Sequence, residues 1–139
     1  MNDLEQAKSM LTMAERDLKA LKGMGDAETF ADEIFGFHAQ QVVEKTLKAW
    51  IVTLGVEYPF VHDISRLLAV LEEGGCNVEK FWDLVEYNAF AIQFRYEAFD
   101  PTERPLDRPF MIGRVQALWG QVKSVVEDIE TKSDKRPLG

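Results

Sequence analysis

Apolar side chains recur every three or four positions along most of the chain, which is the spacing of helices that bury one face. In the first such segment the stripe consists of Leu4, Ala7, Leu11, Ala14, Leu18 and Leu21. The same spacing, interrupted by glycines, prolines and capping residues, predicts helices over residues 3–22, 27–54, 64–73, 78–97 and 110–131. No segment alternates like a strand, so we expect an all-α fold, an up-and-down bundle of four long helices and one short helix.

The second predicted helix is apolar on more than one side, so we expect a central helix that contacts several neighbours. Gly36 lies inside it and predicts a close approach of another helix. Asp26 is expected to cap this helix, and the proline-rich residues 100–109 are expected to form a loop. Residues 1–131 would then form a single helical domain, followed by a flexible tail over residues 132–139.

The amino-acid composition argues against several classes of protein. The chain has 139 residues, with 46% hydrophobic and 29% charged residues, as is usual for one globular domain. Sixteen basic and 24 acidic residues give a net charge of −8, which argues against a general nucleic-acid coat but leaves room for a local basic patch. No apolar run approaches the roughly 20 residues of a membrane span, and we expect no membrane association. The absence of a signal-peptide pattern and the single cysteine favour a cytoplasmic protein.

A line of polar side chains runs along the second predicted helix, spaced 3, 4 and 3 residues apart: His38, Gln41, Lys45 and Lys48. Such a line on a central helix must be solvated, paired or used for binding. One interpretation is a ligand-binding surface. The alternative is a hydrogen-bonded bundle network, in which Glu44 and Lys45 are exposed.

Other chemistry-bearing residues give weaker signals. His62 precedes Asp63, which is well placed to cap the third helix. Two histidines and one cysteine without paired spacing do not predict a metal site, and we expect no cofactor. Cys76 has acidic neighbours rather than an activating base, so a catalytic thiolate is not expected. No glycine-rich phosphate loop is present.

Asn88, Arg95 and Tyr96 are polar groups on the aromatic-rich end of the fourth predicted helix. An arginine can hold a phosphate through a bidentate fork, and a tyrosine can stack on a base. In the alternative interpretation Arg95 pairs with a carboxylate such as Glu44, and Tyr96 packs with its hydroxyl outward.

The combination resembles the HEPN domain (higher eukaryotes and prokaryotes nucleotide-binding), above all the small prokaryotic HEPN proteins that accompany minimal nucleotidyltransferases. The matching pieces are Ala7-Lys8 and residues 14–18, residues 37–49 (FHAQQVVEKTLKA), His62-Asp63-Ile64 with Leu67-Leu68, and Phe94-Arg95-Tyr96. The resemblance covers about residues 4–130 and is most specific over residues 37–49. It implies a helical bundle, often a homodimer, whose ligand is a nucleotide or RNA.

Some members of that family are metal-independent RNases that act as toxins. This chain has Arg95, but Asp100, Pro101 and Thr102 stand where the histidine of the Arg-x(4–6)-His motif would be, and no histidine follows. The resemblance therefore does not imply RNase activity for this chain.

Three functions remain open. The first is a non-catalytic HEPN module of a toxin–antitoxin-like system that binds a nucleotide, RNA or a nucleotidyltransferase partner. Its contact residues would be His38, Gln41, Lys45, Lys48, Arg95 and Tyr96. The second is a divergent RNase toxin that uses Arg95. The third is a purely structural interaction protein. Aromatic residues near the end of the fourth helix need cover, which also predicts a homodimer.

Overall fold

Helices make up most of the part of the chain that the computed structural model describes, residues 2–91 and 105–134. They are α1 (Asp3–Lys22), α2 (Asp32–Thr53), α3 (Ile64–Glu73), the 3₁₀ helix η1 (Glu79–Tyr87) and α5 (Arg108–Asp134). No strand occurs within these residues. The all-α prediction is therefore confirmed.

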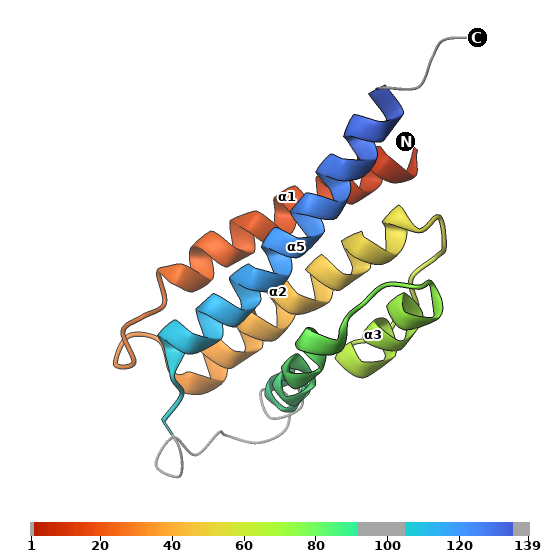
Figure 1. Ribbon diagram of the computed structural model, residues 1–139. Helices are drawn as coiled ribbons and strands as arrows, with labels where there is room; N and C mark the ends of the chain where they lie inside the picture. Colours follow the sequence, from red (N-terminus) through yellow and green to blue (C-terminus); the bar gives the residue numbers. More distant parts are fainter. Residues whose placement is uncertain (1, 92–104, 135–139) are drawn as a thin grey trace, which may run out of the picture.

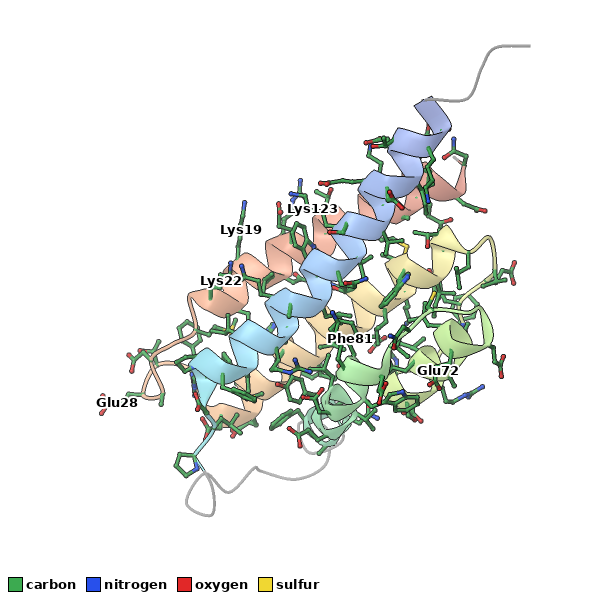
Figure 2. All side chains as sticks on the ribbon, viewed as in Figure 1. Lys19, Lys22, Glu28, Glu72, Phe81 and Lys123 are labelled. Carbon is green, nitrogen blue, oxygen red and sulfur yellow. The ribbon has the colours of Figure 1, made fainter. Side chains whose placement is uncertain are left out.

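The helices are arranged around α2 (Figure 1). Helices α1 and α5 pack against it and against each other, and α3 and η1 also contact it. This arrangement confirms that α2 is a central helix with several neighbours. Helix α5 runs in the same direction as α2, so its end lies beside the start of α1 (Figure 1), where Lys8 and Glu130 form a 2.5 Å ion pair. Lys19 and Lys22 extend outward from α1 (Figure 2).

The predicted start of the second helix was wrong. Helix α2 begins at Asp32, five residues later than expected. Asp26 instead closes a turn, because its carboxylate accepts hydrogen bonds from the backbone N–H of Glu28 (3.1 Å) and the hydroxyl of Thr29 (2.5 Å). The bond from the Thr29 hydroxyl is also the main reason why the pKa of Asp26 lies below its ordinary value. A local side-chain turn thus replaces the first helical turn.

Helix α5 is longer than predicted at both ends. Arg108 and Pro109, expected in the preceding loop, belong to its first turn. Proline is compatible with this position, because the first N–H groups of a helix have no intrahelical partner. The helix also continues to Asp134, three residues beyond the expected end at residue 131.

The fourth helical segment differs in kind from the prediction of a long α-helix over residues 78–97. It runs as a 3₁₀ helix over Glu79–Tyr87 and becomes α-helical over residues 88–91. Its buried positions recur every three residues, at Val78, Phe81, Leu84, Tyr87 and Phe90. Three residues per turn is the period of a 3₁₀ helix, so η1 places Phe81, Leu84 and Tyr87 on one face, and Val78 and Phe90 flank it. Residues 92–97 lie outside the described residues.

Gly36 makes the close approach that its place in the central helix predicts. A Cβ atom built on it would lie 2.3–2.7 Å from atoms of the Phe90 ring. Phe90 itself is buried and meets the ring of Tyr87 edge-on, with 6.1 Å between the centroids. The absence of a side chain at Gly36 thus lets this segment pack directly on α2. None of the described helices is both long and apolar enough to cross a membrane.

Candidate functional site

A buried carboxylate on α2 organises a polar network at the connection between α2 and α3. Glu44 is only 4% exposed, although the network interpretation expected it on the surface. One carboxylate oxygen accepts a 2.8 Å hydrogen bond from Lys48 and lies 2.9 Å from Nδ1 of His62. The other accepts a 2.9 Å hydrogen bond from Gln40, which also donates to the backbone carbonyl of His62 at 3.2 Å. The network therefore joins α2 to the chain that leads into α3.

The charge state of Glu44 follows from two opposing effects. Burial raises the pKa of its carboxyl, because the charged form loses contact with water. Hydrogen bonds from Lys48, Gln40 and His62, together with the charge of Lys48, outweigh burial and hold the pKa below its ordinary value. Glu44 is thus an ionised, fully hydrogen-bonded group at neutral pH.

The predicted line of polar residues on α2 does not form one surface. Gln41 joins the network through a 2.7 Å hydrogen bond to Gln40. Lys45 turns instead to α1, where it forms an ion pair with Asp17. Lys48 pairs with Glu44, and His38 lies edge-on to the ring of Phe37, with 5.8 Å between the centroids. The charges of both lysines are therefore matched by carboxylates of the chain itself.

Asp63 caps α3, as predicted, and also ties it to the fourth helical segment. Its carboxylate accepts hydrogen bonds from the backbone N–H of Ser65 at 3.0 Å and from the hydroxyl of Ser65 at 2.7 Å. Asn88 donates to the same oxygen at 2.9 Å and accepts from the backbone N–H of Ile64 at 3.0 Å. These bonds, led by that of the Ser65 hydroxyl, lower the pKa of Asp63. Arg95 and Tyr96 lie outside the described residues.

Sequence reasoning missed two features, of which the first is Arg108. Its guanidinium is buried and donates hydrogen bonds to the carbonyls of Met24 (2.7 Å) and Phe30 (2.6 Å) and to the carboxylate of Asp32 (2.8 Å). It also lies over the ring of Phe35, 4.8 Å from its centroid. Arg108 thereby links the start of α5 to the turn before α2 through these hydrogen bonds.

The second missed feature is an aromatic pair in the connection between α2 and α3. The rings of Tyr58 and Phe60 meet edge-on, with 5.9 Å between their centroids. Phe60 is 94% exposed, and the ammonium of Lys48 lies 5.5 Å from the centroid of Tyr58. The helix ranges predicted from the sequence leave residues 58–60 between the second and third helices. The two aromatic residues on either side of Pro59 were the available signal.

Within the described residues, no group of three or more histidine, cysteine, aspartate or glutamate side chains is arranged to hold a metal ion. Burial raises the pKa of the Cys76 thiol, and the contact with Trp50 opposes that effect only in part. The thiol is therefore protonated near neutral pH.

Comparison with known proteins agrees with the helical fold. The family model for the HEPN domain matches residues 7–128, which include all of α2, α3 and η1. None of the curated proteins or solved structures is significantly similar to the chain. The match covers most of the 139 residues, and the resemblance to the HEPN domain is thereby confirmed. The chain belongs to the HEPN domain family, whose members are nucleotide- and RNA-related modules.

Proposed function

We propose that this HEPN domain is a non-catalytic module that binds a partner protein, such as a minimal nucleotidyltransferase in a toxin–antitoxin-like system. The observation that supports this proposal is the pairing of the α2 lysines. Lys45 is matched by Asp17 and Lys48 by Glu44. Most affinity for RNA comes from cations that neutralise phosphates, and these two are already engaged.

The charges of the chain also favour a protein partner over RNA. An RNA backbone would have to replace the internal ion pairs of Lys45 and Lys48, and this would leave Glu44 buried without its cationic partner. The chain also carries a net charge of −8, which repels polyanions at long range. A protein partner has no such requirement, because it can present groups of either sign.

The absence of catalysis is part of the proposal and rests on the sequence. No histidine follows Arg95, so the Arg-x(4–6)-His motif of the RNase members of the family is incomplete. Histidine suits acid–base work near neutral pH, whereas aspartate, the residue type at position 100, is a poor proton donor there, because carboxyl side chains generally titrate at about pH 4.

A second candidate function is the binding of a nucleotide at the outer face of the Glu44 network. The side chain of His62 is 59% exposed, although its Nδ1 lies against Glu44. Much of its ring is therefore open to solvent. Lys48 shares the same Glu44 oxygen and lies 5.5 Å from the centroid of the Tyr58 ring. An imidazole, an ammonium and an aromatic ring can together bind a phosphate and a base.

Isothermal titration distinguishes the two candidates. The full chain is titrated with ATP, with GTP, with a ten-nucleotide single-stranded RNA and with a purified minimal nucleotidyltransferase. Saturable binding to the nucleotidyltransferase alone is the expected result. Micromolar binding of a nucleotide or RNA that is lost in His62→Ala, but retained in a control such as Lys19→Ala, would favour the second candidate. Lys19 is suitable because it is exposed on α1.

We also propose that the protein is a homodimer, as the resemblance implies. Four large apolar side chains among the described residues are substantially exposed, including Met13 and Phe110. Light scattering at tens of micromolar is expected to give twice the chain mass of 15.9 kDa. A mass of one chain would contradict this proposal.

A further inference from the structure

A pocket of about 380 Å³ lies where the first turn of α1 meets the end of α2 and the connection to α3. Two of the four exposed large apolar side chains line it, Val56 at 48% and Phe60 at 94% exposure. Isolated exposed apolar residues are common, but two in one pocket indicate a surface that gains from being covered. Tyr58 also lines the pocket, so two of its eight lining residues are aromatic.

Two carboxylates make the pocket electrically negative. Asp3 from α1 and Glu57 from the connection place them on its walls. The C-terminal end of α2 and the N-terminal end of α1 also lie there, and their opposite half charges largely offset each other. Helix α2 has no basic residue in its last turn. Gly55 has a positive φ of 76°, and a Cβ built on it would be in ordinary contact with Asp3 Oδ2 at 3.6 Å, so the Asp3 carboxylate lies beside this turn.

The aromatic pair adds a second attraction for cations. The rings of Tyr58 and Phe60 are inclined at 69° with their centroids 5.9 Å apart, so they form a corner rather than a flat stack. Ring faces attract cations through their quadrupoles. Tyr58 already does so, because Lys48 lies 5.5 Å from its centroid. Lys48 is held by Glu44 and is not among the residues that line the pocket, so it does not supply the cation there.

From this arrangement we propose that the pocket receives an arginine side chain of a partner protein. This inference rests on the proposed function and names the chemistry that the partner must present. A planar guanidinium can lie against the Phe60 ring while its N–H groups donate to the carboxylates of Asp3 and Glu57. The net charge of −8 favours the approach of a basic segment. A nucleotide is disfavoured, because its phosphates would face the two carboxylates of Asp3 and Glu57.

The experiment is an NMR titration of the isotopically labelled full chain with N-acetyl-arginine amide. N-acetyl-citrulline amide is the matched probe, since it has nearly the same shape but no charge. Saturable shifts centred on Gly55, Tyr58 and Phe60 are expected with the arginine probe, and higher salt should weaken them. Equal shifts with citrulline, no saturable shifts with arginine, or shifts of the same residues with an oligouridylate would each overturn the proposal.

Point variants test whether the NMR shifts arise from binding of the arginine probe in this pocket. Phe60→Ala is expected to weaken arginine binding about fivefold, the equivalent of one cation–π contact. The double variant Asp3→Asn/Glu57→Gln is expected to weaken it further and to remove most of its salt dependence. Phe110→Ala is the control, because Phe110 is 59% exposed but lies at the start of α5, away from the pocket. Unchanged arginine affinity in Phe60→Ala would contradict the assignment.

The arginine pocket and the binding of a nucleotidyltransferase can be refuted independently of each other. If a nucleotidyltransferase binds the parent chain and the pocket variants equally well, the protein-binding function stands and the arginine pocket is wrong. If the arginine probe binds as expected but no nucleotidyltransferase does, the pocket stands and that choice of partner is wrong.

Discussion

Replacing Arg108 by methionine removes a buried guanidinium but keeps an apolar side chain of similar length. In the native protein Arg108 is 5% exposed, and the carboxylate of its partner Asp32 belongs to a residue that is 8% exposed. The substitution leaves that carboxylate and the carbonyls of Met24 and Phe30 without their donor. It also removes the cation from the ring of Phe35.

The size of the effect follows from these partners. Removing one member of a buried ion pair typically costs about 3–5 kcal/mol. Arg108 and Asp32 also line an open pocket of about 600 Å³ at the end of the bundle, so water can reach the Asp32 carboxylate when the guanidinium is absent. We therefore expect the low end of that range, about 3 kcal/mol. For a domain of this size, such a loss lowers Tm by roughly 10 °C.

Urea and thermal unfolding of Arg108→Met measure this change, and Arg114→Met is the control. Arg114 also donates three hydrogen bonds, two to Asp83 and one to the carbonyl of Lys80, but at an exposed site. Its loss should cost about 1 kcal/mol or less. Equal destabilisation of the two variants would refute the reasoning, because burial would then not decide the cost. In Asp32→Leu/Arg108→Met, part of the lost stability should return, since no unpaired charge remains.

Three further predictions concern the core and the network. Gly36→Ala should cost about 1–3 kcal/mol in urea unfolding by overpacking against Phe90, and Phe90→Leu in the same chain should recover part of it. Because the pKa of Glu44 is lowered in the fold, its contribution to stability is present above the unfolded pKa of about 4.3 and is lost as pH falls through the folded value. The free energy of unfolding should therefore fall less steeply as pH is lowered in Glu44→Gln than in the parent chain. Trp50→Ala should cost about 3–5 kcal/mol and Lys45→Ala under about 1 kcal/mol by the same assay, which separates core from surface positions.

The helices that the sequence predicts accurately are those with local signals at both ends. Helices α1 and α3 have the predicted bounds, because Asn2 and Asp63 cap their starts through side-chain hydrogen bonds and Gly23 and Gly74 follow their ends. At Asp26 the same capping chemistry serves a turn instead of a helix. A capping residue thus identifies a local hydrogen bond but not the structure that follows it.

The candidate site was only partly predictable, because its contacts join distant parts of the chain. The helical spacing predicted one polar line on α2, of which Gln41 and Lys48 take part in the Glu44 network. It could not show that the neighbouring Glu44 is buried, because its partner His62 lies 18 residues away and reaches it through a connector. The partners of Arg108 are 76–84 residues distant, and no periodicity signals contacts at that range.

The most direct test of the account is a cleavage assay. The purified full chain is incubated with labelled total RNA in the absence of metal, beside an Arg95→Ala variant. The account predicts that neither protein cleaves the RNA, because no histidine follows Arg95 to complete the RNase motif. Cleavage by the parent chain and not by Arg95→Ala would contradict the central claim and make Arg95 a catalytic residue.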